Sequence, residues 1–331
     1  MAKFDRDLLF LYSENARTKI RDLAKTLDRS PQSLKYSLKV LEKEELLGDT
    51  YTIFDYSYFG LILFRIYFKG GYLSDRDKEV ILSKLNENPY IVTIYELSGE
   101  FDLVLEIESP NPSRFNKELK KLVSLFPTFN HYKVVLNLVT HIYPRNYLLS
   151  LKEPIVHLHP EIIIGGDRGV EPFNENELSI VHNLLQTPKL RMTALAKASG
   201  MNVKTVKTTL KHLQKRRIVR GCKHILDPNK LDLYKFRIFL KLHNLSPEKE
   251  EEFLDFLLKT REIVQLNKTV GDWDMEVDLE SLDRNRIRQL ALQLREDFKE
   301  LIEDFNVIEF YRYYKKSYLP SYLFSGEEDS N

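Results

Sequence analysis

Basic and short polar side chains gather on one segment, residues 203–215, whose spacing fits a single helix face. Its lysines recur at intervals of three and four, so they form a stripe opposite the apolar Val206 and Leu210. Contact with a DNA duplex needs cations that reach phosphates and short polar groups that reach base edges. The segment carries both and therefore predicts binding to double-stranded DNA. The predicted contact residues are Asn202, Lys204, Thr205, Lys207, Thr208, Lys211, Lys215, Arg216, Arg217 and Arg220.

Charge is distributed unevenly along the 331 residues. The formal net charge is only +1, yet residues 176–223 hold eleven Lys or Arg and one acid, which gives +10. Residues 3–49 carry +1, so the remainder carries −10. A basic segment beside an acidic body is typical of a phosphate-binding surface. A lysine-rich helix that is merely solvated usually has acids interspersed, but none lies between Lys189 and Lys223.

A second, weaker version of this pattern lies near the N-terminus. Gln32 has the amide group that can read adenine. Acids at Glu42, Glu44 and Glu45 follow, however, and would repel phosphate. We expect this helix to bind DNA more weakly than residues 203–215, or to prefer another sequence. Its candidate contact residues are Gln32, Ser33, Lys35, Tyr36 and Lys39.

The two patterns belong to a duplication. Residues 5–110 and 177–282 match without a gap at a constant offset of 172. The triplet that begins at Phe64 returns at Phe236, and Gly99-x-x-Asp102 returns as Gly271-x-x-Asp274. Solenoid units are only tens of residues long, so this period indicates duplication of a whole domain pair. The chain is predicted to form its own pseudo-dimer.

Each copy predicts three short helices followed by strands. Ser30 before Pro31 is a good helix cap, as is Asn202 in the second copy. Three helices with a tight turn between the last two predict a helix-turn-helix, with residues 50–55 and 222–227 as the wings. The alternative is a plain three-helix packing module without a ligand. Beyond the wings, the order strand–helix–strand–strand–helix–strand predicts a ferredoxin-like unit in each copy.

The predicted fold class is α+β, with two winged helix-turn-helix domains and two ferredoxin-like βαββαβ domains in an intrachain pseudo-dimer. The predicted domains are residues 1–55 and 176–228 for the winged helix-turn-helix units, 60–143 and 233–316 for the ferredoxin-like units, 144–175 for a linker and 317–331 for a tail.

Each half resembles the Lrp/AsnC (feast–famine) family of transcriptional regulators. The matching segments are LAKTLDRSPQSLKYSLKVLEKEELLGD from residue 23, LAKASGMNVKTVKTTLKHLQKRRIVRG from residue 195, and the two Gly-x-x-Asp turns. These matches follow the order of the family in both copies. The resemblance implies a sequence-specific regulator of transcription whose sensor domain binds a small effector such as an amino acid.

The Gly-x-x-Asp turns allow two interpretations. In a structural role, glycine permits positive φ in a hairpin loop and the aspartate bonds turn amides. By the resemblance, the turns lie beside the effector pocket, where a carboxylate would hold an ammonium group. The candidate effector residues are Gly99, Asp102, Gly271 and Asp274.

Other chemistry receives little support from the sequence. His157-x-His159 has no neighbouring thiol or paired acid, and Cys222 is the single cysteine. We therefore expect neither a metal nor a cofactor, and no enzyme activity. We also expect a cytoplasmic, archaeal protein that has no membrane segment. Exposed sheet edges suggest a homodimer or higher assembly through the sensor domains. Two alternatives remain open: a nucleoid-type DNA-packing protein, and an enzyme like the siroheme decarboxylases, which share this fold and can be fused in tandem.

Overall fold

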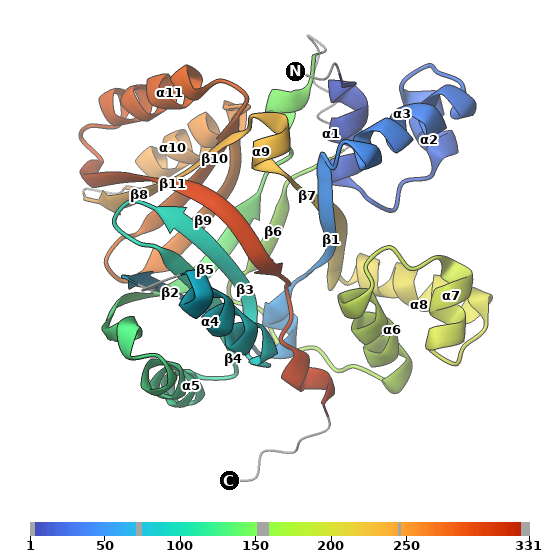
Figure 1. Cartoon of the computed structure of the whole chain (residues 1–331), viewed down its shortest axis with the longest axis horizontal. Coiled ribbons are helices and arrows are strands. Elements are labelled where there is room, and N and C mark those ends of the chain that lie inside the picture. Colours follow the sequence, from blue (N-terminus) through green and yellow to red (C-terminus); the bar gives the residue numbers. More distant parts are fainter. Residues whose placement is uncertain (1–3, 71–74, 151–158, 244–245, 326–331) are drawn as a thin grey trace.

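The computed structural model describes residues 4–70, 75–150, 159–243 and 246–325 (Figure 1). Helices and strands alternate in the order that the duplication predicts, and the α+β fold class is confirmed. A large sheet with helices on its outer faces lies on one side of the molecule, and two helical lobes lie on the other. The lobes are the two helix-turn-helix units.

The first lobe is built from α1 (Arg6–Glu14), α2 (Ile20–Thr26) and α3 (Pro31–Lys43). The predicted cap of α3 is confirmed, because the Ser30 hydroxyl accepts a hydrogen bond from the Ser33 amide at 3.2 Å. Its apolar face, formed by Leu34, Leu38 and Leu41, is buried against α1 and α2.

The second lobe repeats this arrangement in α6 (Glu175–Gln186), α7 (Met192–Ala198) and α8 (Val203–Lys215). Asn202 caps α8 by accepting from the Thr205 amide at 2.8 Å. The buried residues of α8 are Val206, Leu210 and Leu213, as the periodicity predicts. The opposite face of the helix is thereby directed to solvent.

The wings differ from the prediction. Strand β1 (Leu47–Phe54) follows α3 and strand β7 (Val219–Leu226) follows α8, and the two pair with each other, antiparallel, in a two-stranded ribbon. Neither strand folds back on its own unit as a hairpin wing. An isolated strand leaves its backbone N–H and C=O groups unpaired, and here the equivalent strand of the other copy supplies their hydrogen-bond partners. The ribbon joins the two lobes to one another.

The ferredoxin-like units have the predicted βαββαβ order. Helices α4 and α5 cover the outer face of one unit, and α10 and α11 cover the other (Figure 1). The first unit contains β2 (Ile62–Lys69), α4 (Asp75–Glu87), β3 (Ile91–Ser98), β4 (Leu103–Ser109), α5 (Pro112–Leu125) and β5 (His131–Ile142). The second, which the short α9 (Pro228–Leu231) precedes, contains β8 (Tyr234–Leu242), α10 (Pro247–Lys259), β9 (Ile263–Val270), β10 (Met275–Ser281), α11 (Arg284–Asp297) and β11 (Ile302–Lys316).

Both sheets join into a single closed structure. The strand order is β2-β4-β3-β11-β8-β10-β9-β5-β6, and β2 also pairs with β5. The strands other than β6 (Ile162–Gly165) therefore form a barrel. The last strand of each unit closes it, since β5 extends onto β9 and β11 extends onto β3. The exposed edges that suggested a homodimer are consequently paired within the chain.

The backbone preserves the duplication where the sequence has diverged. Positive φ recurs 172 residues apart at Asp28 and Gly200, and at Gly60 and Asp232. Positive φ also recurs just after the C-terminal ends of α3 and α8, at Glu45 and Arg217. Non-glycine residues rarely adopt this conformation, so its recurrence reflects inherited turn geometry rather than residue type.

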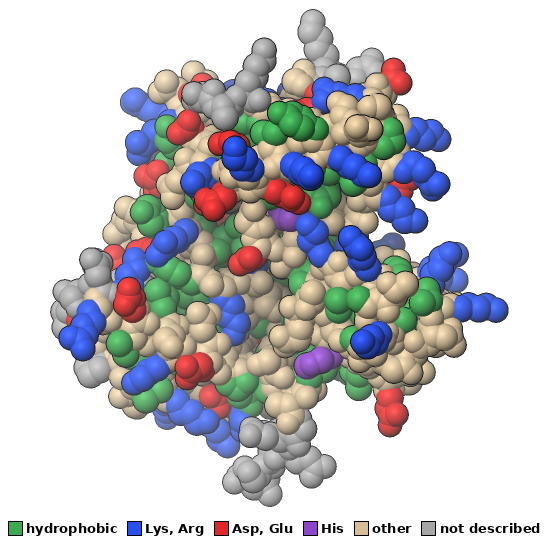
Figure 2. Space-filling view, turned by 45° about the vertical axis from the view of Figure 1, so that its right-hand side comes forward, with side chains coloured by type: hydrophobic (Ala, Val, Ile, Leu, Met, Phe, Trp, Pro, Cys, Tyr) green, Lys and Arg blue, Asp and Glu red, His purple; other side chains and the backbone are tan. Residues whose placement is uncertain are grey.

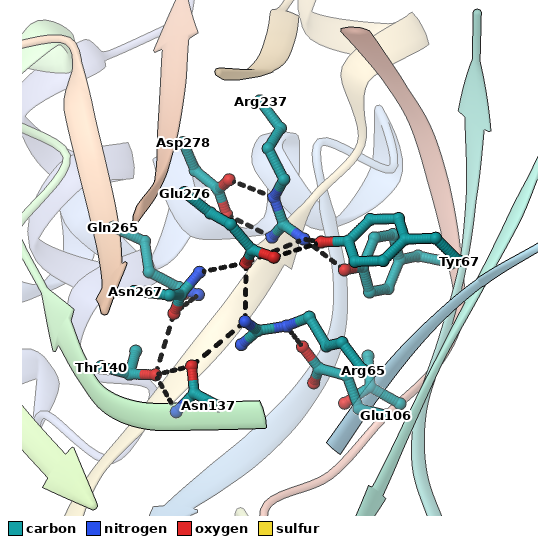
Figure 3. Close-up of polar contacts among 12 residues, drawn as sticks. Arg65, Tyr67, Glu106, Asn137, Thr140, Arg237, Gln265, Asn267, Glu276 and Asp278 are labelled. Atoms are coloured by element: carbon teal, nitrogen blue, oxygen red, sulfur yellow. Dashed lines mark hydrogen bonds and ion pairs between the residues drawn. The ribbon is translucent and has the colours of Figure 1, made fainter. Parts of the chain in front are cut away.

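The barrel interior contains a cluster of buried charged side chains (Figure 3). Arg65 and Arg237, which are equivalent in the two copies, are 1% and 2% exposed. Each has a carboxylate on the adjacent strand: Arg65 Nε donates to Glu106 at 2.6 Å, and Arg237 Nε donates to Asp278 at 2.6 Å. Such pairs satisfy only part of each guanidinium, which has five N–H donors.

Glu276 supplies the remaining charge between the two arginines. Its carboxylate lies 2.6 Å from Arg65 Nη1 and 3.6 Å from Arg237 Nη1, and it accepts from the Tyr67 hydroxyl at 2.7 Å. Burial alone would raise the pKa of Glu276, but both arginines hold that pKa below its usual range. The equivalent residue in the first copy is Val104. A single carboxylate therefore serves both halves.

The segment between the copies adds an edge strand beside the barrel. Strand β6 pairs with the end of β5, and Gly165 approaches so closely that an added Cβ would lie 2.7 Å from the Tyr56 hydroxyl. Gly165 has φ +82°, which favours glycine. Among the helices described, none combines the length and apolarity that a membrane span requires.

We predict that the β1–β7 ribbon weakens the protein in acid through His224. Burial lowers the pKa of this imidazole to about 4, although its Nδ1 lies 3.0 Å from the Gly48 carbonyl oxygen. Below about pH 6.5, His224 is protonated in the unfolded chain but stays neutral in the folded protein until the pH approaches 4. The free energy of unfolding therefore falls as the pH drops from about 6.5 towards 4, by at most about 3 kcal/mol. Urea unfolding of wild type and His224→Gln at several pH values measures this.

His224→Gln keeps a donor for Gly48 and removes the titration, so its stability should depend less on pH over that interval. His131→Gln, at an exposed site, is the matched control and should follow wild type. Identical pH dependence in all three proteins would contradict the assignment.

We predict that Glu276→Gln destabilises the barrel by about 3–5 kcal/mol, because it breaks the buried ion pairs of Glu276 with Arg65 and Arg237. Denaturant unfolding measures the change. Glu296→Gln, on the exposed face of α11, serves as the control and should change stability by less than about 0.5 kcal/mol. Equal stability of the two variants would show that Glu276 does not neutralise the pair.

Candidate nucleic-acid interface

The lysine stripe of α8 is open to solvent. Lys204, Lys207, Lys211 and Lys215 are all exposed, whereas Val206, Leu210 and Leu213 of the same helix are buried. Within the part of the chain that the structure describes, none of the four takes part in an ion pair. The rigid helix therefore presents four uncompensated charges along about three turns.

The polar residues near the start of α8 divide into two groups. Thr208 is exposed, and its hydroxyl donates to the Lys204 carbonyl at 3.1 Å. Thr205 is half-buried, and its amide is used by the Asn202 cap. Thr208 is thus the better placed of the two threonines to reach a base edge.

Arg216 does not extend the stripe as the sequence suggested. Its guanidinium donates to Glu177 and Glu171, both at 2.7 Å, and lies 5.5 Å from the Phe173 ring centre. Burial would lower the pKa of Arg216, but these two carboxylates raise it. The side chain ties α8 to the segment before α6, so it is engaged within the fold rather than free for a phosphate.

Arg217 and Arg220 are placed differently from each other. Arg217 is exposed at the end of α8 and remains a candidate for phosphate contact. Arg220 is half-buried on β7, where its Nε is buried and has no hydrogen-bond partner. Arg220 lines a cleft between α8, β7 and the end of α1, whose volume is about 560 Å³.

The first recognition helix, α3, is also exposed. Gln32, Ser33, Lys35 and Lys39 face solvent, and Tyr36 is 73% exposed. Glu45 is paired with Lys230 at 3.2 Å, but Glu42 and Glu44 are exposed near the same end. The geometry leaves α3 available to DNA with less net positive charge than α8.

A space-filling view displays both lobes together. Lys and Arg side chains project from the upper and lower lobes along one side of the molecule, and the surface is hollowed between them (Figure 2). Basic side chains are therefore present on both helix-turn-helix lobes, as they are elsewhere on this face.

The Gly-x-x-Asp turns have a structural function in the barrel. Asp102 accepts a hydrogen bond from the Gly70 amide, and Asp274 accepts from the Leu242 amide at 2.8 Å and from Lys241 at 3.0 Å. Each carboxylate thereby fixes the end of the neighbouring strand. Gly271 has φ +153°, and an added Cβ would lie 3.1 Å from the Val134 carbonyl oxygen of the other copy.

Aromatic rings occupy the space beside these turns. Phe101 and Trp273, at equivalent positions, are 2% and 5% exposed and pack with Tyr67 and Phe239. Lys133 lies above both rings and bridges the two turns, 3.6 Å from Glu100 and 3.1 Å from Asp272. Gly99, Asp102, Gly271 and Asp274 thus border a filled junction rather than a cavity.

The remaining reactive residues are structural. His159 packs against Phe10 with the ring centres 5.6 Å apart, and burial lowers the pKa of its imidazole. His157 lies outside the described residues. Burial raises the pKa of the Cys222 thiol to about 11. Among the described residues, no group of three or more potential ligands is placed to hold a metal ion.

Two basic residues outside the recognition helices went unnoticed in the sequence. Arg17 and Lys189 are equivalent in the two copies and lie in the loops after α1 and α6. Arg17 Nη1 donates to the Pro188 carbonyl at 2.7 Å, and Lys189 donates to the Tyr12 hydroxyl at 3.1 Å. The recurrence of a cation at this loop in both copies was the available signal.

Comparison with known proteins supports the helix-turn-helix assignment. Residues 1–47 match the family described as winged helix-turn-helix DNA-binding. The chain is also 25% identical to the uncharacterized HTH-type transcriptional regulator PH0045 of Pyrococcus horikoshii, over 40% of this chain and 95% of that protein. That relative corresponds in extent to a single copy of the duplicated unit.

The duplicated architecture matches a solved enzyme along almost its whole length. The siroheme decarboxylase NirDL superposes with a TM-score of 0.57 at 13% identity, covering 95% of this chain and 93% of that one. This finding contradicts the prediction that the chain is not an enzyme, because the structure that matches the entire architecture belongs to a decarboxylase. At this level of identity the likeness shows a shared fold and nothing of the reaction.

Single-unit regulators match part of the chain. The Escherichia coli AsnC structure covers 41% of this chain and 92% of its own, with 16% identity and a TM-score of 0.35. The winged helix-turn-helix match covers the first lobe, and the regulator relative has the length of one copy of the duplicated unit.

Proposed function

We propose that this protein is a sequence-specific regulator of transcription that binds double-stranded DNA through α8 and α3. The observation that carries the proposal is the solvent-exposed lysine stripe of α8, free of ion pairs among the described residues, on a helix whose apolar face is buried. The helix-turn-helix match and the regulator relative support it.

We propose that α8 and α3 contribute differently to DNA binding because their charges differ. Lysines on α8 face no acid on their own helix, so they contact phosphates, and the exposed Thr208 reaches base edges. On α3, Gln32 and Tyr36 contact bases and the nearby acids reduce affinity. Two unlike helices docked in successive major grooves, about 34 Å apart, would read an asymmetric site.

A small-molecule effector forms part of the proposal. The filled junction between the Gly-x-x-Asp turns argues for a ligand site elsewhere in the molecule. Because the barrel closes within the chain, a single copy contains both recognition helices. Double-stranded DNA and a small effector are therefore its proposed partners.

We predict that Lys207→Glu/Lys211→Glu abolishes DNA binding, whereas Lys35→Glu/Lys39→Glu only weakens it. The first pair lies in the basic stripe, and the second lies beside acids. Fluorescence anisotropy with fragments selected from a genomic library measures both. Binding should also fall steeply with salt, since each phosphate contact adds about 0.9 to the slope of log affinity against log salt concentration.

Equal effects of the two double variants would contradict the proposed difference between α8 and α3. If bulk DNA at equal concentration displaces the selected fragments from the wild-type protein, the protein is a DNA-packing protein rather than a regulator. Glu296→Lys, on α11 of the barrel, is the control for a general gain or loss of charge and should bind as wild type does.

A second candidate function is decarboxylation of a tetrapyrrole carboxylate, which the whole-chain likeness to siroheme decarboxylase favours. The cavities described inside the barrel mouth measure about 40 and 20 Å³, well below the roughly 300–1,000 Å³ of ligand pockets. Such a substrate would have to occupy one of the larger surface clefts, of which the one between α1, α8 and β7 carries cationic residues.

We predict that, if this candidate holds, incubation with siroheme replaces carboxylate by hydrogen and releases CO2, which mass spectrometry and absorbance detect. Heat-denatured protein is the control. An unchanged tetrapyrrole after long incubation would eliminate the candidate, while the DNA-binding proposal would stand on its own measurement.

A further inference from the structure

A cleft with an unusual charge balance lies between the two helix-turn-helix lobes. Its volume is about 560 Å³, which falls within the range of small-molecule sites. One wall is the buried edge of α8, the floor is β7, and the opposite side is the end of α1 with the loop that follows it. It is separate from the junction between the Gly-x-x-Asp turns.

Four cations line this cleft without a carboxylate partner among the described residues: Arg17, Lys207, Lys211 and Arg220. The acid that lines it, Glu14, is already neutralised by Lys223 at 2.6 Å and by Arg145 at 3.3 Å. The cleft therefore keeps a net positive charge that nothing in its lining balances.

Burial makes this imbalance more costly. Burial lowers the pKa of both Arg17 and Arg220, and among the described residues the buried Nε of Arg220 has no hydrogen-bond partner. An unpaired buried donor forfeits its interaction with water, and a partly desolvated cation gains most from an anion placed beside it. The Arg17 guanidinium donates to the Pro188 carbonyl through Nη1, and its five N–H donors allow it to bond to a ligand as well.

The rest of the lining is largely apolar. Leu184 and Leu210 contribute side chains that are 1% and 5% exposed, so a hydrocarbon or aromatic body would be sheltered from water. A ligand that satisfied both features would have an apolar body and at least two negative charges.

We propose that this cleft binds an organic polyanion with an apolar body and that the bound ligand releases the protein from DNA. Lys207 and Lys211 belong both to the cleft and to the exposed stripe of α8. A ligand that neutralises them removes two of the four stripe charges, so ligand and DNA phosphates compete for the same cations. This antagonism rests on the proposed DNA-binding function, whereas the ligand site itself does not.

The test uses the full chain and the fluorescent dianion bis-ANS, which combines aromatic rings with two sulfonates. The expected result is a one-to-one complex that Arg17→Gln/Arg220→Gln weakens at least tenfold. Arg17→Lys/Arg220→Lys retains the charges and should bind within about threefold of wild type, which separates loss of the site from loss of the fold. Arg217→Gln, an exposed arginine outside the cleft, is the matched control and should bind like wild type.

Competition then distinguishes the two sources of negative charge. Displacement of bis-ANS by 2,6-naphthalenedicarboxylate assigns a carboxylate ligand, and displacement by ATP assigns a phosphate ligand. Displacement by neither, or unchanged binding to Arg17→Gln/Arg220→Gln, overturns the proposal, because the rings rather than the charges would then hold the probe.

A final arm measures duplex affinity with and without saturating bis-ANS. At least tenfold weaker duplex binding is expected, and undiminished binding overturns the antagonism. If the protein binds duplexes but not bis-ANS, this inference fails alone. If it binds bis-ANS but no duplex, the proposed function fails and the ligand site stands. Lys204→Gln/Lys215→Gln, which lies outside the cleft, should weaken the duplex and leave bis-ANS binding unchanged.

Discussion

The electrostatic contact of Arg65 and Arg237 with Glu276 is the constraint around which this molecule is built. Two guanidiniums related by the duplication lie inside a closed barrel, and each is paired with a carboxylate of its own copy, Glu106 or Asp278. Glu276 links these two pairs, since it lies 2.6 Å from Arg65 and 3.6 Å from Arg237, and it is held in turn by Tyr67, Trp273 and Asn267 at 2.7–3.1 Å. A buried network of hydrogen bonds and ion pairs of this kind favours a rigid arrangement of the two sheets.

That rigidity is transmitted to the helix-turn-helix lobes. Strands β5 and β11 each cross from one copy to the other, and the β1–β7 ribbon does the same between the lobes. Both recognition helices are therefore carried by one covalent and hydrogen-bonded body instead of by two subunits in equilibrium. Binding of DNA requires no prior association of two chains, so affinity need not depend on dimerisation. The cleft beside α8 lies where the lobes and the ribbon meet.

The sequence predicted the helices and strands well, because their signals are local. Helical spacing, the Ser30 and Asn202 caps and the offset of 172 residues sufficed for these. It did not predict the barrel interior. The alternation Val104, Glu106 and Glu108 against Leu103, Leu105 and Ile107 correctly indicates a strand, but gives no sign that the polar face is buried. Periodicity also does not reveal contacts with residues far away in the sequence, such as the pairing of β1 with β7 and the ion pair between Arg216 and Glu177.

The unequal pair Val104 and Glu276 has an evolutionary meaning. At the axis of a symmetric dimer each residue occurs twice, so an ancestral pair of identical chains could have supplied either two carboxylates or none. Fusion removed that restriction and allowed an odd number of charges at the centre. Two first halves would face one another with arginines that are each paired with Glu106, whereas two second halves would carry a surplus of acid, because each would add its own Glu276.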